Sequence, residues 1–127
     1  MKSNSTGNEG ILYNNGTALV ENSIFIGNYT RWGSLTNDRM LKVNNCTLRD
    51  NVGYDGKSTY KFGASIATNT GAADYYSSYG LDGLVTIITN STFINNDQND
   101  IYQNQGDLEV TNCNFINNTG IYIMVKN

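Results

Sequence analysis

The chain of 127 residues has no histidine, only two cysteines and few charged residues, which make up 15% of the sequence. Histidine is the commonest general base in enzymes, and its absence removes the usual starting point for acid–base catalysis. With no Cys-x-x-Cys pair either, no familiar metal-binding pattern is left. The net charge of −3 provides no basic patch for phosphate groups. We therefore expect no metal, no cofactor and no nucleic-acid partner.

Long hydrophobic runs are also missing. No stretch approaches the roughly 18 apolar residues of a membrane-spanning helix. The opening segment MKSNSTGNEG lacks the apolar core of a signal peptide. We expect no membrane insertion by this segment, and we interpret the chain as a fragment of a longer protein that was given an initiator Met.

What the sequence does contain is a segment that recurs four times. In each copy, apolar residues alternate with other residues and are followed by Asn, then Ser or Cys, then Phe or Leu, then a second Asn. The copies are ALVENSIFIGN (18–28), LKVNNCTLRDN (41–51), VTIITNSTFINN (85–96) and LEVTNCNFINN (108–118). Alternation with a period of two is typical of a strand with one buried face, and Asn, Thr and Val are poor helix formers.

The columns of the aligned copies predict which side chains form the core. Val20, Val43, Ile88 and Val110 share one column and should point inward. The residues between them on each strand, such as Lys42 and Glu109, are mostly polar and should face water.

The repeat length selects the fold. Phe25 and Leu48 are 23 residues apart, and Phe93 and Phe115 are 22 apart, which fits a solenoid repeat built from strands. Such a unit makes a full circuit and returns to the same column, so the sequence predicts a single all-β domain over residues 1–127, a single-stranded parallel β-helix of about five coils. The Asn columns should then form ladders of side-chain amides between coils, and Asn also tolerates the left-handed conformation of sharp turns.

One interval is longer than the others. Leu48 and Phe93 are 45 residues apart, with no further copy of the repeat between them. We interpret this interval as one coil, the third, that carries two inserted loops at 52–61 and 72–83. Between the loops, FGASIATNTG (62–71) aligns with the leading strands of the other coils, which are GILYNNG (10–16), GSLTNDR (33–39) and NDIYQNQG (99–106).

The two cysteines should not form a disulfide. Cys46 and Cys113 share a column, but Ser91 lies between them, so they are separated by at least two coil spacings, roughly 9 to 10 Å. A disulfide requires Cα atoms within about 7 Å. We predict two reduced thiols that point inward as small apolar fillers.

These motifs resemble two families of surface proteins. FIGN (25–28), FINN (93–96) and FINN (115–118) match the FxxN signature of the chlamydial-type polymorphic outer-membrane proteins, and GASI (63–66) is a degenerate form of their GGA[ILV] signature. The whole chain is also similar to the adhesin-like surface proteins of methanogenic archaea. This resemblance implies a right-handed β-helix, related in fold to pectate lyases, in an extracellular, cell-surface location.

The inserted loops supply the candidate binding site. Tyr and Trp are enriched at recognition surfaces because they combine a large contact area with a polar tip. We predict an aromatic contact surface for a glycan or protein of a host or neighbouring cell; the alternative is that these tyrosines only pack the loops onto the coil. The candidate residues are Tyr54, Tyr60, Tyr75, Tyr76 and Tyr79 in the loops, with Tyr29 and Trp32 in the equivalent turn of the preceding coil.

We expect no enzymatic activity, because the outward acids Glu21 and Glu109 lie three coils apart, about 14 Å, and cannot act together. The interpretation that follows is an extracellular adhesin segment. Two alternatives stay open: a carbohydrate-binding or polysaccharide-processing module, and a self-assembling stalk unit that makes axial contacts where IYIMVKN (121–127) begins a further coil. Among the N-x-S/T sequons, Asn4 and Asn15 are the expected sites of any glycosylation, since Asn28, Asn45 and Asn90 belong to the ladders.

Overall fold

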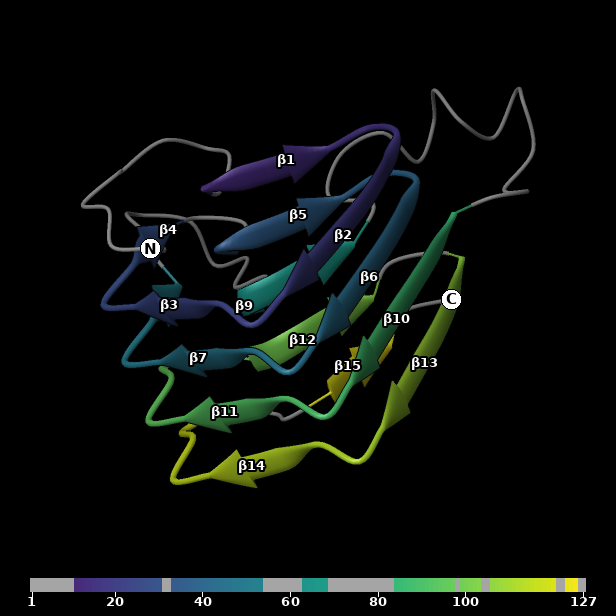
Figure 1. The fold of residues 1–127 in the computed structure, drawn as a ribbon. Helices are drawn as coiled ribbons and strands as arrows, with labels where there is room; N and C mark the ends of the chain where they lie inside the picture. Colours follow the sequence, from purple (N-terminus) through teal and green to yellow (C-terminus); the bar gives the residue numbers. More distant parts are fainter. Residues whose placement is uncertain are drawn as a thin grey trace.

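The computed structural model describes residues 11–30, 33–53, 63–68, 84–97, 99–103, 106–120 and 123–125. These residues form fifteen short strands and no helix (Figure 1). The strands are β1 (Leu12–Asn14), β2 (Thr17–Glu21), β3 (Ile24–Ile26), β4 (Tyr29–Thr30), β5 (Leu35–Asn37), β6 (Met40–Asn44), β7 (Thr47–Arg49), β8 (Val52–Gly53), β9 (Gly63–Thr68), β10 (Val85–Thr89), β11 (Thr92–Ile94), β12 (Asn99–Gln103), β13 (Asp107–Thr111), β14 (Asn114–Ile116) and β15 (Ile123–Val125).

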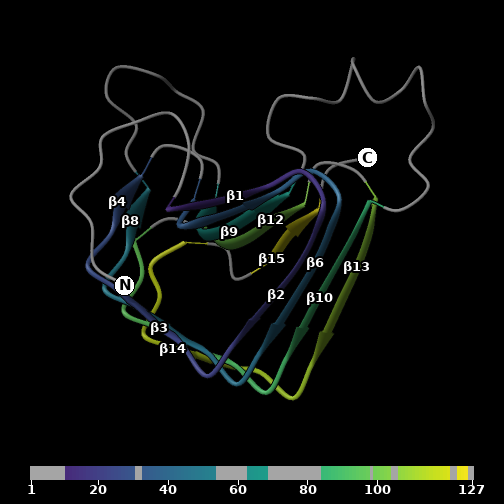
Figure 2. The same ribbon diagram turned by 45° about the horizontal axis from the view of Figure 1, so that its top comes forward.

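The strands assemble into three main sheets. One sheet has five strands in the order β1-β5-β9-β12-β15, and two have four strands each, in the orders β13-β10-β6-β2 and β14-β11-β7-β3; β4 and β8 form a separate pair. Each registered strand pair is parallel. The chain passes through the sheets in turn and returns one position along, so they stack like the coils of a solenoid or β-helix (Figures 1 and 2). The prediction of an all-β, parallel, coil-like architecture is confirmed.

The core consists of the predicted inward columns. Val20, Val43, Ile88 and Val110 are strand partners across β2, β6, β10 and β13, and the first three are buried. The Phe/Leu column is equally continuous, and the Phe93 and Phe115 rings stack with centroids 5.0 Å apart and an interplanar angle of 7°. Parallel strands in register place like side chains above one another, which explains why the same residue types recur in each column.

Two columns of left-handed residues make the turns. Asn22, Asn45, Asn90 and Asn112, each at the turn between two strands, have φ values of 52° to 54°. A second corner repeats the conformation at Gly27, Asp50, Asn95 and Asn117, with φ values of 53° to 63°. Asn, Asp and Gly are the residues that adopt this conformation at least cost, so the composition of the repeat follows from its two sharp corners.

The residue that follows the first Asn of each repeat stabilises the turn at that Asn. Ser23, Cys46, Ser91 and Cys113 each donate a side-chain hydrogen bond to the carbonyl two residues earlier, at 2.8 to 3.4 Å. Both cysteines are free thiols, Cys46 buried and Cys113 half-buried, as the column positions predicted. Burial raises the pKa of the Cys46 thiol, which keeps it protonated and unreactive.

The second Asn of the repeat forms a buried ladder. The Nδ2 of Asn28 donates to the Oδ1 of Asn51 at 3.0 Å, and the Nδ2 of Asn51 donates to the Oδ1 of Asn96 at 3.1 Å. The same two acceptor oxygens also bind the backbone N–H groups of Asn28 and Asn51 at 3.0 Å, and the Oδ1 of Asn118 binds the backbone N–H of Asn96 at 2.9 Å. These amides replace the backbone partners that a corner would otherwise leave unpaired.

The first Asn column is less regular than predicted. It is exposed, and the Nδ2 of Asn45 donates to Asn22 and that of Asn112 to Asn90, at 2.7 and 2.6 Å. The Nδ2 of Asn90, however, donates to the Oδ1 of Asn44 and not to Asn45. The amides of this column are thus hydrogen-bonded but do not form one continuous ladder, because an exposed side chain is free to choose a neighbouring acceptor.

Asn51 and Asn96 are neighbours in the buried ladder although 45 residues separate them, against 23 and 22 for the pairs on either side. Strand β9 lies between β5 and β12, so this long interval supplies a single strand to the five-stranded sheet. The residues Val52 and Gly53, which were predicted to belong to the first loop, instead form β8 and pair with Tyr29 and Thr30. The rest of the predicted loop residues lie outside the described part of the chain.

Candidate binding surface

Of the seven aromatic residues predicted to form the site, the structure describes one. Tyr29 lies in β4 and is 39% exposed. The other six predicted residues, which are Trp32, Tyr54, Tyr60, Tyr75, Tyr76 and Tyr79, lie outside the described residues.

Tyr29 lies where the first predicted loop begins. It pairs with Val52, and the next residue of its strand, Thr30, pairs with Gly53, the last described residue before that loop. Any chain that continues from Gly53 therefore starts beside Tyr29. The sequence placed Tyr29 near the loop tyrosines only by its position in the repeat. The strand pairing shows that Tyr29 lies beside Val52, where the first predicted loop begins.

The second predicted loop begins at a corner shared by all coils. In the first two coils, Asn14 and Asn37 are each followed by two residues before the next sheet begins at Thr17 and Met40. Their strand partners in the third coil are Thr68 and Val85, and the sixteen residues 69–84 connect these two. The long connection therefore departs from a corner that the first two coils close with two residues and the fourth with three, 104–106.

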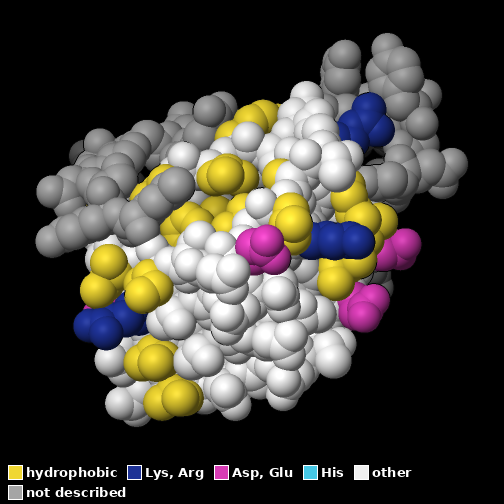
Figure 3. Space-filling view, in the orientation of Figure 1, with side chains coloured by type: hydrophobic (Ala, Val, Ile, Leu, Met, Phe, Trp, Pro, Cys, Tyr) yellow, Lys and Arg dark blue, Asp and Glu magenta, His cyan; other side chains and the backbone are white. Residues whose placement is uncertain are grey.

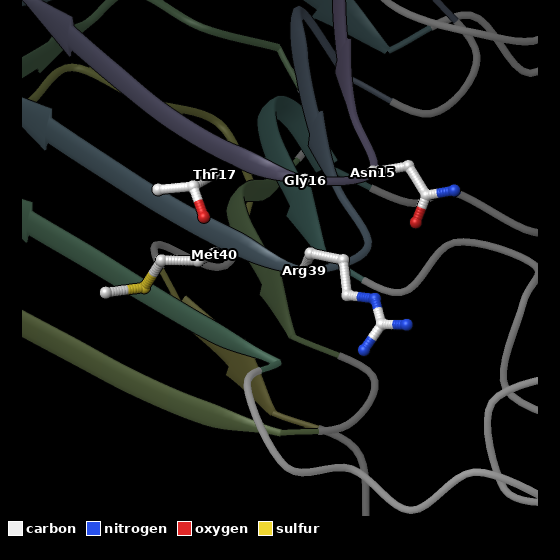
Figure 4. A pocket seen from close by; sticks show the side chains of 5 residues that line it. All are labelled: Asn15, Gly16, Thr17, Arg39 and Met40. Atoms are coloured by element: carbon white, nitrogen blue, oxygen red, sulfur yellow. The ribbon is translucent and has the colours of Figure 1, made fainter.

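A shallow pocket of about 320 Å³ lies at this same corner, on the first two coils. It is lined by Asn15, Gly16, Thr17, Arg39 and Met40 (Figure 4). The side chains of Asn15 and Arg39 extend to one side, and those of Thr17 and Met40 to the other. The pocket combines a cation, an amide, a hydroxyl and a thioether. Sequence reasoning did not single out Arg39, because its neighbours come from a different coil.

Asn15 is exposed beside this pocket, as expected for a glycosylation acceptor, whereas Asn28 is fully buried within the ladder. Asn45 and Asn90 are hydrogen-bonded but exposed, so burial excludes glycosylation only at Asn28.

The outward face of the β2–β6–β10–β13 sheet is more apolar than the sequence columns predicted. Its outward positions include Leu19, which is 60% exposed, and the half-buried Met40, Val85 and Ile87, together with the predicted polar Lys42 and Glu109. Figure 3 shows hydrophobic side chains beside a basic group over this sheet, with acidic groups at its edge. The expectation of a mostly polar outer face is wrong for β10, whose outward positions include Val85 and Ile87, whereas on β2 Leu19 lies between Thr17 and Glu21.

One carboxyl group is deeply buried. Asp100 has no exposed surface; its Oδ1 accepts a hydrogen bond from the Nδ2 of Asn96 at 2.9 Å, and its Oδ2 has no partner. Burial raises the pKa of Asp100 to about 7, despite the opposing effect of the Asn96 hydrogen bond. A carboxyl group without access to solvent is not placed to act on a substrate. Asp100 is the last residue of the segment NNDQND (95–100), here called the NNDQND cluster, and no sequence pattern indicated that it would be internal.

The neighbouring Asp97 behaves differently. It accepts a 2.7 Å hydrogen bond from the hydroxyl of Thr119 at an exposed position. The two acids of the cluster are thus held by different partners, one on the surface and one inside. Within the described residues, no group of three or more His, Cys, Asp and Glu side chains could hold a metal ion.

The described residues include no helix long and apolar enough to cross a membrane.

The stacked parallel sheets and Asn ladders place the chain in the class of parallel-stranded solenoids. A scan against protein-family models found no match, and searches of curated proteins and of solved structures found no similar protein.

Proposed function

We propose that the chain is an extracellular adhesin segment of a cell-surface protein, a right-handed β-helix of about five coils whose third coil presents two Tyr-rich loops to a glycan or protein partner. The observation that carries this proposal is the strand pairing around β9. Leu48 and Phe93 are direct partners, so the stack accommodates the extra residues of this coil without interruption.

A rigid stack that carries long loops on a single coil is suited to recognition. The sheets and the buried Asn ladder hold the loop bases in fixed positions, and loops on a rigid scaffold commonly carry binding residues. Tyr29 at the base of the first loop adds an exposed ring to the five loop tyrosines. Together, these rings would give a partner a large contact area with hydroxyl groups for hydrogen bonding.

Replacing Tyr75, Tyr76 and Tyr79 by Ser tests the proposal. We expect binding to target cells or to an immobilised glycan to fall at least about tenfold, since aromatic residues commonly dominate binding energy. The matched control is Ile116→Ser, which removes an exposed apolar side chain from β14. Unchanged binding by the triple variant, with an unchanged circular dichroism spectrum, would contradict the proposal.

The pocket at Arg39 favours a second candidate, a carbohydrate-binding module. Its amide, hydroxyl and guanidinium groups are typical partners of sugar hydroxyl and carboxylate groups. Titration with neutral and acidic oligosaccharides, compared between the wild type and Arg39→Ala, separates this candidate from the first, because the adhesin proposal places binding at the tyrosines.

The ends of the stack favour a third candidate, a self-assembling stalk. Leu12 and Ala18 at one end, and Leu108, Val110 and Phe115 at the other, are only partly buried against the core. Axial stacking of a second copy would cover them. A monomeric mass at all protein concentrations, measured by light scattering, would argue against this candidate.

A further inference from the structure

The outward face of the β2–β6–β10–β13 sheet has an ordered charge pattern. One row across the sheet contains Leu19, Lys42, Ile87 and Glu109, which are register partners on successive strands. The row therefore reads apolar, cation, apolar, anion. Ile87 stands at the centre of the last three, with a cation on one side and an anion on the other.

The two charges are not neutralised by the described part of the molecule. Lys42 and Glu109 lie two strands apart, roughly 9 to 10 Å, and neither forms an ion pair with any described residue. Both are exposed, while Ile87 and its neighbour Val85 on the same strand are half-buried. An apolar strip between opposite charges is a pattern that a binding partner can match.

We propose that this face is a self-association surface, on which two copies of the chain meet about a two-fold axis that runs parallel to β10. Rotation about this axis turns one sheet over onto the other and exchanges the positions of β6 and β13. Lys42 of each copy then faces Glu109 of the other, and Ile87 and Val85 each face their own equivalents. A two-fold interface must be self-complementary, and the sequence cation–apolar–anion is its own complement when reversed.

The pattern identifies the occupant as a second copy of this chain. An unrelated protein would need a flat apolar strip with the same charges in reverse order and at the same spacing of about 4.8 Å. A second copy of the chain has the same charges at the same strand spacing, because both copies contain the same sheet. The proposal goes beyond the adhesin function and does not depend on it.

The interface is small, which sets the expected affinity. Three strands of five residues cover about 17 Å by 10 Å, well below the roughly 800 Å² per partner of a standard stable interface. We expect a weak dimer with a dissociation constant in the range of about 10 μM to 1 mM. Its two exposed ion pairs should make it weaker at high salt.

Sedimentation velocity at increasing concentration of the whole chain tests the proposal. Lys42→Glu and Glu109→Lys should each weaken self-association at least about tenfold, because each replaces two attractive pairs by two repulsive ones. An equimolar mixture of the two variants should restore association, since the two carboxylates of one variant then face the two ammonium groups of the other. Glu21→Lys is the matched control: it changes the charge as Glu109→Lys does, but β2 lies outside the overlap of the two sheets.

The proposal would be overturned by a wild type that stays monomeric up to about 1 mM, by association that persists unchanged in Lys42→Glu, or by a mixture of the two charge variants that stays monomeric. A loss of association in Glu21→Lys equal to that in Glu109→Lys would also overturn it, because it would indicate a general effect of charge. Axial stacking through the coil ends predicts that none of these three substitutions has an effect. Unfolding curves of the variants check that the fold is intact.

Discussion

At the scale of single residues, Asn51 shows how one buried amide joins neighbouring coils. Its Oδ1 accepts hydrogen bonds from the backbone and side chain of Asn28, and its Nδ2 donates to Asn96 and to the carbonyl of Phe25. The side chain has no exposed surface. All its hydrogen-bonding capacity is therefore met by protein groups and none by water.

Asn51→Ala should lower the free energy of unfolding by about 2 to 4 kcal/mol, because it leaves several buried polar groups unpaired. Asn114→Ala, at an exposed position of β14, is the control and should cost less than about 1 kcal/mol. Chemical denaturation of both variants provides the measurement. A cost for Asn51→Ala no greater than that of the control would mean that the ladder does not stabilise the stack.

Asp100 should make the stability of the fold fall as pH rises. Its pKa is about 7 in the folded chain, against an ordinary value of 3.8. Between these values the unfolded chain loses the proton while the folded chain keeps it, so the folded state binds more protons and is destabilised by rising pH. The loss is complete once the pH exceeds about 7.

Asp100→Asn should remove this pH dependence and raise the free energy of unfolding above pH 7 by roughly 2 to 4 kcal/mol. The variant keeps the acceptor for Asn96 and introduces no charge. The measurement is the difference in the free energy of unfolding between variant and wild type, taken at about pH 4 and at about pH 8. The contributions of the other carboxyl groups are the same in both proteins and cancel in this difference. An equal difference at both pH values would contradict a raised pKa.

At the scale of elements, β9 shows that a coil can carry extra chain without losing register. Leu35, Ile66 and Ile101 remain direct partners across β5, β9 and β12. The register between β9 and β12 shifts between Asn99 and Ile101, where β9 has an extra residue opposite Asp100. Asp100, the residue of β12 at this β-bulge, is fully buried.

Deleting residues 70–83 should leave the fold intact. The remaining Asn69 and Leu84 would form a two-residue connection, the length that joins Asn14 to Thr17 and Asn37 to Met40. We expect the free energy of unfolding to change by less than about 1 to 2 kcal/mol, since loop length contributes little to closure entropy. Loss of partner binding in this folded variant would support the adhesin proposal, and failure to fold would show that the loop is part of the core.

Sequence columns predicted these elements wherever the side chain is internal. The inward Val and Phe columns, the free thiols and the second Asn ladder all follow from stacking like residues in register. The outer face was predicted less well. Leu19 and Ile87 occupy outward positions, where either an apolar or a polar side chain can be accommodated. The burial of Asp100 could not be predicted, since carboxylates are rarely fully buried and no residue pattern around Asp100 indicates an internal position.

At the scale of the whole molecule, one coil interval decides how many turns the stack has. The strand pairing makes Leu48 and Phe93 neighbours, so the 44 residues between them span a single step of this column. If the interval formed two turns instead, the two aromatic loops would become ordinary strands. The proposed binding site depends on this distinction.

Nuclear Overhauser contacts between backbone protons are the most direct test of the pairing between Leu48 and Phe93. The parallel register predicts contacts that link Phe25 to Leu48, Leu48 to Phe93, and Phe93 to Phe115. Contacts between Leu48 and residues in the range 62–75, or the close Hα–Hα contacts of antiparallel strands, would contradict it.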